Sequence, residues 1–363
     1  MTTSYTVDVI AGDGIGTEVV PAAIACVDRA AELHGFRMDW RHRAWGSDHY
    51  RRHGSMMPHD GLEQLRDGDA IFLGAVGTPD IKDDVTLWGL LIPIRRAFHQ
   101  YVNLRPVKTV PGRSGQELDL LIVRENVEGE YSEIGGRLGR GTPDEIAVQE
   151  SVFTRRGIER VTRFAVARAA ERGGTLISAT KSNGIIHTMP FWDEVVAEVA
   201  AEGGVRVDSV LIDALAARFV LAPDSIDVVV ASNLFGDILS DLAAAVAGSI
   251  GIAPSANLNP EREWPSLFEP VHGSAPDIAG RGVANPTAAI WSAAMMLDHL
   301  GETAAGAAVH DACFGTLADG IATGDLGGTA TTAEFTEAVL DRLGRPESPH
   351  PTPAAATSPR HRP

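Results

Sequence analysis

Short apolar runs alternate with longer amphipathic segments along most of the chain. Runs rich in Val, Ile, Leu and Ala predict buried strands at 6–11, 70–73, 119–123, 175–179 and 227–231. Apolar residues spaced along one helix face predict helices at 17–34, 154–171, 191–201 and 286–300. Strands and helices that alternate in this way predict an α/β fold with a mainly parallel sheet. Catalytic groups in such folds lie where strands end.

The segment 226–242 is the most informative part of the chain. The β-branched run 228–230 ends just before Ser232, where an amphipathic helical pattern begins. Asp237 and Asp241 stand four residues apart on this helix, so their Cβ atoms lie about 5–6 Å apart on one face. Two carboxylates so placed repel each other, and an Mg²⁺ or Mn²⁺ ion between them removes the repulsion. The alternative is an acidic first turn that complements the helix dipole.

Three glycines, Gly12, Gly14 and Gly16, lie between the first predicted strand and the first predicted helix. Their spacing departs from the dinucleotide-binding pattern G-x-G-x-x-G because Thr17 stands at the third glycine position. Asp13 also places an acid between the first two glycines. A tight structural turn is therefore favoured over a pyrophosphate site.

The formal net charge of −17 argues against a nucleic-acid or anionic membrane partner. An anionic substrate would therefore need a local basic pocket. Arg95, Arg105 and Arg124 occur near the ends of successive patterned segments. The planar guanidinium group suits bidentate binding of carboxylates, so the region predicts a carboxylate site. The alternative is that each arginine is a solvated surface charge.

Three further residues are candidates for chemistry. Tyr131, seven residues after Arg124, is a candidate acid if the carboxylate site exists. Lys181 follows a predicted strand. A lysine held near cations loses proton affinity and can act as a base. The alternative is an ordinary lysine at a strand end. Asp213 lies in an otherwise apolar segment, where a carboxylate costs free energy unless it is paired or metal-bound.

The Gly- and Pro-rich segment 267–285 precedes the last predicted helix. A loop of this length predicts ligand binding, with a structural loop as the alternative. Backbone N–H groups at Gly273 and Ser274 can hold a nucleotide. The Asp277 carboxylate can bind ribose hydroxyls and would repel a 2′-phosphate.

A length of 363 residues with 44% hydrophobic residues indicates a globular protein with two or three domain-sized units. Cys26 and Cys313 stand in no metal-ligand spacing and are predicted to be buried, reduced thiols. The sequence shows no signal peptide and no apolar run of about 18 residues, which predicts a cytoplasmic protein. The Pro- and Ala-rich tail 346–363 is predicted to be disordered.

Several segments together resemble the isocitrate/isopropylmalate dehydrogenase family of β-decarboxylating dehydrogenases. The resemblance runs from about residue 7 to residue 343 and is strongest to the members that act on D-malate and tartrate. The segments that carry it are MMPHDGLEQL, FLGAVGTPD, VRENVEGEYS, QESVFTRRG, SATKSNG, VVVASNLFGDILSDL and GIAPSANLNPE.

The resemblance implies a homodimer of two-domain subunits that share active sites. A discontinuous domain, residues 1–100 plus 251–345, would bind the cofactor. The intervening residues 101–250 would provide the dimer contacts and the metal and substrate sites. This order would place the loop around Asp277 beside the N-terminal segment.

The resemblance also implies a role for each candidate residue. Arg95, Arg105 and Arg124 would bind the substrate carboxylates, and Tyr131 and the partner subunit's Lys181 would transfer protons. Mg²⁺ or Mn²⁺ would be held by Asp237 and Asp241 together with the partner subunit's Asp213. Tyr131, Lys181 and Asp213 would then be the catalytic residues. NAD, rather than NADP, would bind at His272, Gly273, Ser274, Ala275, Asp277, Ile278 and Asn285.

The implied reaction is the NAD-dependent oxidative decarboxylation of a D-malate-like 2-hydroxy dicarboxylate, namely D-malate to pyruvate and CO₂, or tartrate oxidation. Trp88 and Gly89 match this group, but Leu90 stands where those members carry serine. Leu90 on the wall nearest the substrate's C3 would favour the alternative, 3-isopropylmalate or another 3-alkylmalate. Pro93 is expected to bend the same helical stretch. A non-catalytic regulatory subunit is disfavoured because all the proton-transfer and metal residues are present.

Overall fold

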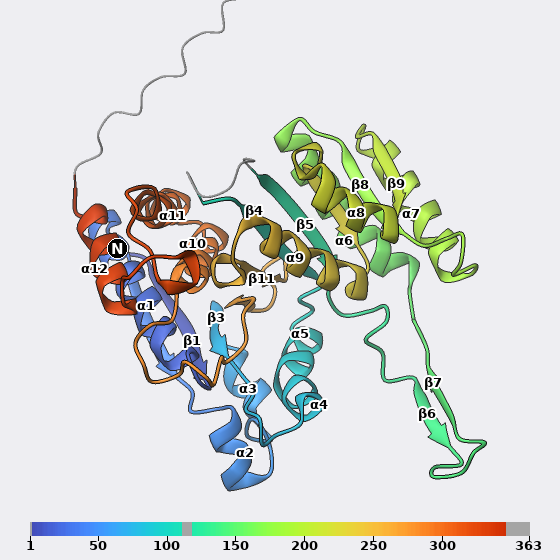
Figure 1. Ribbon diagram of the computed structural model, residues 1–363, viewed down its shortest axis with the longest axis horizontal. Coiled ribbons are helices and arrows are strands. Elements are labelled where there is room, and N and C mark those ends of the chain that lie inside the picture. The colour runs from blue at the N-terminus through green and yellow to red at the C-terminus, as the bar shows by residue number, and fades with distance from the viewer. Residues whose placement is uncertain (1, 111–117, 346–363) are drawn as a thin grey trace, which may run out of the picture.

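The computed structural model describes residues 2–110 and 118–345 (Figure 1). The tail 346–363, predicted to be disordered, lies outside the described residues. Ten of the described strands form one sheet. Across the sheet they follow the order β2 (Arg37–His42), β1 (Ser4–Gly12), β3 (Ala70–Ala75), β12 (Ser266–Pro270), β11 (Pro254–Leu258), β4 (Val102–Lys108), β5 (Asp119–Glu125), β10 (Val228–Ala231), β8 (Leu176–Thr180) and β9 (Val207–Leu211).

Helices pack against the sheet and gather at its two ends (Figure 1). In chain order they are α1 (Gly16–His34), α2 (Ser47–His53), α3 (Gly61–Leu65), α4 (Asp83–Thr86), the π-helix η1 (Leu87–Leu91), α5 (Ile92–Ala97), α6 (Arg155–Arg172), α7 (Thr188–Glu202), α8 (Ile212–Leu221), η2 (Pro223–Ser225), α9 (Asn233–Ala247), η3 (Ile250–Ile252), α10 (Thr287–Leu300), α11 (Thr303–Ala318), η4 (Gly324–Leu326) and α12 (Thr332–Leu343). The α/β prediction is confirmed.

The sheet is mixed but mainly parallel. Strand β11 runs antiparallel to both β12 and β4, and β4 runs antiparallel to β5. All the other neighbouring strands of the sheet are parallel. The antiparallel pairs β4–β5 and β11–β12 are each consecutive in the sequence, so they need no helical crossover.

Every strand and helix expected from periodicity is present. The helix expected at 191–201 begins earlier, at Thr188, and the helix expected from 286 begins at Thr287. One part of the loop prediction was wrong. The first residues of 267–285 belong to strand β12, whose residues are all buried, and the loop begins only after Pro270.

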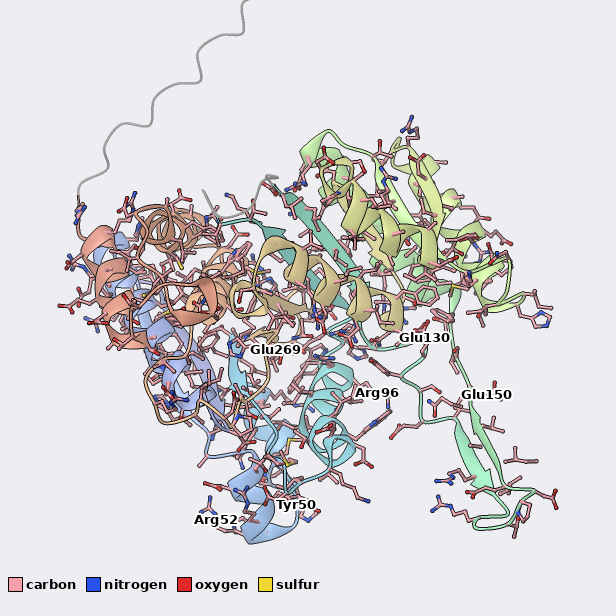
Figure 2. All side chains as sticks on the ribbon, viewed as in Figure 1. Tyr50, Arg52, Arg96, Glu130, Glu150 and Glu269 are labelled. Atoms are coloured by element: carbon pink, nitrogen blue, oxygen red, sulfur yellow. The ribbon has the colours of Figure 1, made fainter. Side chains whose placement is uncertain are left out.

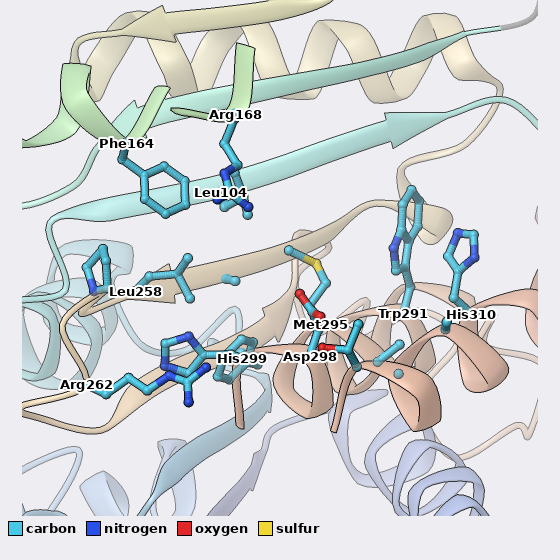
Figure 3. A pocket seen from close by; sticks show the side chains of 17 residues that line it. Leu104, Phe164, Arg168, Leu258, Arg262, Trp291, Met295, Asp298, His299 and His310 are labelled. Atoms are coloured by element: carbon cyan, nitrogen blue, oxygen red, sulfur yellow. The ribbon is translucent and has the colours of Figure 1, made fainter. Parts of the chain in front are cut away.

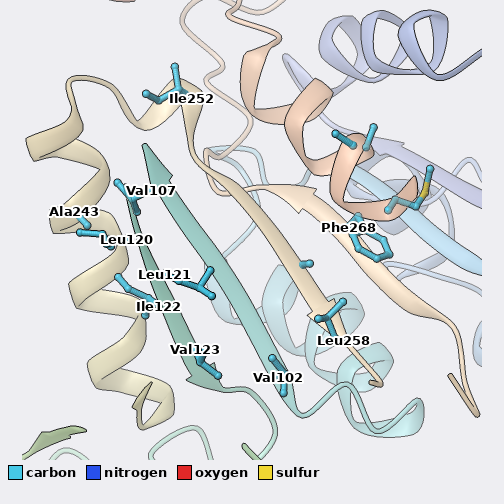
Figure 4. Packing of buried hydrophobic residues seen from close by; sticks show 14 of the residues in the cluster. Val102, Val107, Leu120, Leu121, Ile122, Val123, Ala243, Ile252, Leu258 and Phe268 are labelled. Atoms are coloured by element: carbon cyan, nitrogen blue, oxygen red, sulfur yellow. The ribbon is translucent and has the colours of Figure 1, made fainter. Parts of the chain in front are cut away.

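Side-chain alternation along β5 divides the core between the two faces of the sheet. Leu120 and Ile122 face Ala243 of α9, whereas Leu121 points toward the opposite face (Figure 4). Helix α9 begins after Ser232, whose hydroxyl accepts a hydrogen bond from the Phe235 N–H. Its apolar side packs on β4 and β5, which fixes the polar side relative to the strand ends.

A two-stranded hairpin, β6 (Gly135–Leu138) and β7 (Ile146–Gln149), projects from the body of the molecule (Figure 1). Every residue of both strands is exposed. Figure 2 shows Glu150 on this projecting segment and Glu269 within the molecule.

The glycine turn between β1 and α1 has a structural role, as expected. The buried Asp13 carboxylate accepts hydrogen bonds from the Ser47 hydroxyl at 2.6 Å and from the Gly77 N–H at 2.8 Å. The Ile15 N–H donates to the Ser274 carbonyl oxygen at 2.9 Å. The loop after β12 therefore lies beside the N-terminal segment, which confirms that prediction.

Both cysteines are buried and free, as predicted. Burial raises the pKa of the Cys26 thiol to about 12. Among the helices of the described residues, none combines the length and apolarity required to cross a membrane.

Replacement of Gly14 by Ala tests the contact between the turn and the loop. Gly14 has a φ of +52°, and an added Cβ would overlap the Ser274 carbonyl oxygen. Gly35 is the matched control, because its φ is +81° but its Cβ would meet open space. We expect Gly35→Ala to cost about 1 kcal/mol of unfolding free energy and Gly14→Ala about 2 to 3 kcal/mol more. Equal shifts in the urea-unfolding midpoint would contradict this expectation.

Candidate functional site

A cavity of about 240 Å³ lies where the ends of several strands meet helix α9. Three arginines enter it, together with Tyr131 and Asp237. Its walls are completed by Leu73, Gly74, Ala75, Val76, Leu87, Leu91, Ser255, Glu269, Pro270, Val271, His272 and Gly273. The three arginines are the ones predicted from sequence: Arg95, Arg105 and Arg124.

Arg124, at the end of β5, is the most buried of the three arginines. Its guanidinium group contacts the Asp237 carboxylate through Nη1 and donates from Nη2 to the Asn233 side-chain oxygen at 2.7 Å. The Tyr131 hydroxyl donates to the other Asp237 oxygen at 3.0 Å. Strand β5, the loop of Tyr131 and helix α9 are thus joined by one polar cluster.

Arg105, on β4, connects the cavity to both aspartates. Its Nη1 donates to the Ser240 hydroxyl oxygen at 2.6 Å and lies 3.2 Å from Asp237 Oδ1. The same nitrogen lies 3.5 Å from Asp241 Oδ1. The predicted aspartate pair therefore lies on one helix face, opposite Arg105.

Arg95, on α5, is oriented by buried polar groups beneath the cavity. Its Nη2 donates to Glu269 Oε1 at 3.0 Å, and the same oxygen accepts from Asn257 Nδ2 at 2.8 Å. The Asn257 side-chain oxygen in turn accepts from Asn126 at 2.9 Å. This arrangement fixes the guanidinium group at the cavity wall.

The two aspartates have opposite electrostatic environments. Burial disfavours the charged form of Asp237, but Arg124 and Arg105 outweigh it and lower the pKa of this carboxyl. Burial raises the pKa of Asp241, with opposition from Arg105 and support from Asp237. Burial and the Asp237 charge together raise the pKa of the Tyr131 hydroxyl. Tyr131 therefore keeps its proton at neutral pH.

Lys181 and Asp213 lie together, but they do not line the cavity. Lys181 Nζ donates to Asp213 Oδ1 at 2.6 Å, and this contact lowers the pKa of the Asp213 carboxyl. The Asp213 side chain is 67% exposed, so its carboxylate is stabilised by the ion pair with Lys181 and is not buried. Across residues 2–110 and 118–345, no three His, Cys, Asp or Glu side chains lie close enough to hold a metal ion. The contribution of a partner subunit remains a prediction.

The predicted cofactor residues follow the loop from the cavity to the outer surface. His272 and Gly273 line the cavity, and burial lowers the pKa of the His272 imidazole. Asp277 is exposed, and Ala275 has a φ of +40°. Farther along, Asn285 is buried and donates to Asp325 at 3.0 Å, while Ser274 is buried and Ile278 is partly buried.

The expectation for Leu90 was wrong. Leu90 is fully buried and packs with Met56 and Phe98, whereas Leu91 and Leu87 line the cavity. Leu87, Leu91 and Arg95 recur every four residues on the cavity side, whereas Leu90, Ile94 and Phe98 recur with the same spacing on the buried side. Pro93 stands in the first turn of α5, where the missing N–H is tolerated, and the bend expected there stays a prediction.

Four residues that hold the site together were not predicted: Asn233, Ser240, Glu269 and Glu130. Glu130 accepts from the Ser232 hydroxyl at 2.7 Å and from the Leu234 N–H at 3.0 Å, so it fixes the Tyr131 loop to the start of α9. Asn233 and Ser240 share a helix face with Asp237, and extending the helical period to polar residues would have found them. Glu269 has no local signal, because its partner Arg95 is far away in the sequence.

The fold is that of the β-decarboxylating dehydrogenases. The chain belongs to the isocitrate/isopropylmalate dehydrogenase family, whose model matches residues 6–339. A probable tartrate dehydrogenase/decarboxylase of Bacillus subtilis is 52% identical over 347 residues, covering 93% of this chain and 98% of that protein. The decarboxylating D-malate dehydrogenase of Escherichia coli is 52% identical over 347 residues, covering 91% and 96%. The isocitrate dehydrogenase structure from Methylococcus capsulatus has a TM-score of 0.85 at 32% identity, covering 94% of this chain and 100% of that chain.

A buried carboxyl beside the cavity predicts a pH-dependent stability. Glu125 follows Arg124 and accepts hydrogen bonds from the Val127 and Glu128 N–H groups at 3.0 and 2.7 Å. Burial raises the pKa of this carboxyl from 4.5 to about 7. Between these values the folded state binds more protons than the unfolded state, so stability falls as pH rises through this interval.

Glu125→Gln removes the titration, and we expect its stability relative to the parent protein to rise by roughly 2 kcal/mol between about pH 5 and pH 8. Urea-unfolding midpoints at the two pH values measure this difference. Glu337→Gln, at an exposed position on α12, is the control and should show little change. The same pH dependence in both variants would rule out a special role for the buried carboxyl.

Proposed function

We propose that this protein catalyses the NAD-dependent oxidative decarboxylation of a D-malate-like 2-hydroxy dicarboxylate, with D-malate or tartrate as substrate. The observation that carries the proposal is the cavity in which Arg95, Arg105 and Arg124 gather beside Asp237 and Tyr131. The relatives named for tartrate and D-malate decarboxylation match nearly the whole chain, which supports the same reaction here.

The charge of the cavity favours a small polycarboxylate. Three arginines against the two carboxylates of Asp237 and Glu269 leave a net positive charge among the ionised lining groups. Planar guanidinium groups bind carboxylates in paired hydrogen bonds. A dicarboxylate that pairs with Arg105 and Arg124 would replace the aspartate as their partner, so the Asp237 carboxylate would become free for another cation.

Asp237 and Asp241, with the partner subunit's Asp213, would hold Mg²⁺ or Mn²⁺. The donor set fits these ions, because both prefer carboxylate oxygens and the Asp241 side chain is 54% exposed and accessible. A divalent ion there supplies Lewis-acid stabilisation of negative charge on the keto oxygen.

Two side chains would move the protons. The partner subunit's Lys181 would take the proton of the substrate's hydroxyl group, and NAD⁺, when bound, would supply the acceptor for the hydride from C2. The carboxylate on C3 then leaves as CO₂, and the Tyr131 hydroxyl donates its proton to that carbon. The raised pKa of Tyr131 supports its part, because an acid must hold its proton until this step.

A homodimer would bring these groups together. Exposed apolar side chains on α8 and α9, among them Leu221 at 80% and Ile238 at 52% exposure, offer a surface for a second copy. The projecting hairpin adds exposed Leu138, Ile146 and Val148. The exposed Lys181–Asp213 pair would complete the neighbouring cavity from its own subunit.

NAD would lie along the loop after β12, with Asp277 toward the ribose. The proposed cofactor domain consists of residues 1–100 and 251–345, and 101–250 would form the second domain. In support, the loop is fixed to α1, where Glu18 accepts from the Gly280 and Gly282 N–H groups at 2.6 and 2.8 Å.

A substrate panel tests the proposed reaction. With NAD⁺ and Mn²⁺ present, we expect NADH formation with the highest kcat/KM for D-malate or a tartrate isomer, because the cavity of about 240 Å³ suits a small acid. The panel includes 3-isopropylmalate and isocitrate, and reactions with a chelator serve as controls. NADH formation from 3-isopropylmalate alone, or full activity after chelation, would contradict the proposal.

Lys181→Ala tests the base. We expect a loss of kcat of about 10²- to 10⁴-fold, the usual contribution of a general base, while the affinity for NADH stays within about twofold of the parent value. Lys82→Ala is the matched control, because Lys82 is exposed and lies outside the cavity. Turnover and NADH titration of both variants measure the effects. Retained turnover in Lys181→Ala would remove this lysine from the mechanism.

A further inference from the structure

A second cavity, of about 430 Å³, lies between α6 on one side and α10 and α11 on the other. Figure 3 shows Phe164 and Arg168 entering from one side and His299, Met295 and Trp291 from the other. Its volume lies in the usual range for small-molecule sites, roughly 300–1,000 Å³. Nothing in the proposed reaction uses this cavity.

The strands β4, β11 and β12 separate the second cavity from the first. Leu104 lines the second cavity and the next residue, Arg105, lines the first. On β12 the same alternation holds for Phe268 and Glu269. Because successive side chains of a strand point to opposite faces, the two cavities lie on opposite faces of the same strands.

The strand register aligns the residues of each cavity. Ala256 pairs with Phe268 on one side and with Leu104 on the other, and all three line the second cavity. Ser255 pairs with Glu269, and both line the first. A molecule in the second cavity would therefore contact the strands that carry Arg105 and Glu269.

Aromatic rings supply much of the wall of the second cavity. Trp291 and His310 meet at a ring-centroid distance of 5.4 Å, and Phe268 and His299 meet at 5.6 Å. Phe164 faces them from α6 (Figure 3). Such a wall favours a planar ring, which can stack on the aromatic faces.

Two arginines and one aspartate line the second cavity. Arg168 is paired with Glu171 at 2.6 Å, but Arg262 has no ion-pair partner among the residues that the structure describes. Burial and the adjacent Arg262 lower the pKa of His299 to about 4, so this histidine is neutral at pH 7. Asp298 lies exposed among the lining residues.

The backbone holds Arg262 in place. Its φ is +57°, an uncommon value for a residue other than glycine. The surrounding turn is closed by the Asn259 side-chain oxygen, which accepts from the Glu263 and Trp264 N–H groups at 2.8 and 3.2 Å. Arg262 is exposed at the edge of the cavity, so its guanidinium group can pair with an anion there without breaking an existing ion pair.

We propose that this second cavity is a binding site for a small molecule that joins a planar aromatic ring to an anionic group. The ring would lie between the partly exposed rings of Phe164 and His299, and the carboxylate, sulfonate or phosphate would pair with Arg262. The site is separate from the cofactor loop and does not depend on the proposed reaction.

Anilinonaphthalene sulfonate, an aromatic anion, is the probe for this site. Binding to the full-length protein is followed by calorimetry with saturating NAD⁺ present, so that the dinucleotide site does not compete. Ala307→Trp places an indole at the exposed side of the lining, and Ala304→Trp, exposed on the same helix but outside the cavity, is its matched control. We expect Ala307→Trp to weaken binding by at least about tenfold and Ala304→Trp to leave it unchanged.

The anionic contact is tested by Arg262→Gln, with Arg206→Gln, at a 76% exposed arginine, as its control. We expect only Arg262→Gln to weaken binding, by about tenfold. Equal binding by all four variants, or no saturable binding by the parent protein, would overturn the proposal. The substrate panel measures a different property, so the binding result stands even if the proposed reaction fails. A failure of this binding test likewise leaves the proposed reaction untouched.

Discussion

The contact between the Arg124 guanidinium group and the Asp237 carboxylate organises the first cavity. Arg124 is 2% exposed, and a buried cation without a partner would cost several kcal/mol. Burial and the neighbouring Arg105 lower the pKa of Arg124 to about 10, because both disfavour a positive charge at this position. Asp237 offsets this cost, so the end of β5 and the face of α9 must stay together.

The same contact links stability to the proposed chemistry. In the chain alone, the arginines neutralise the aspartates, and Tyr131 adds a hydrogen bond to Asp237. Under the proposed function, a dicarboxylate would take over the arginines while a divalent cation would take over the aspartates. The dicarboxylate would pair with the arginines that Asp237 leaves when it binds the metal, and the metal would pair with the aspartates that the arginines leave. Substrate and metal should therefore bind cooperatively for electrostatic reasons.

Periodicity predicted the α/β fold because strands and helices differ in the spacing of their apolar residues. It also predicted that Asp237 and Asp241 lie on one helix face, since helical spacing is a local property. It could not by itself show which leucine faces the substrate; in the structure Leu87 and Leu91 line the cavity, whereas Leu90 lies on the buried side of the same helical segment. Nor could it find Glu269, whose contact with Arg95 arises only when β12 joins the sheet. Local patterns therefore predicted the elements, whereas contacts between distant elements required the structure.

Alternation along the strands places a polar cavity on one face of the sheet and an aromatic cavity on the other. One step along β4 passes from Leu104 to Arg105, and one step along β12 passes from Phe268 to Glu269. A slip of one residue in the register of either strand would exchange an apolar wall for a charge in both cavities. Strand β11 pairs with both β4 and β12, so its hydrogen bonds hold the two registers together. The antiparallel strands in the centre of the sheet thus do more than close the core, because they fix the positions of the polar and the aromatic cavity at the same time.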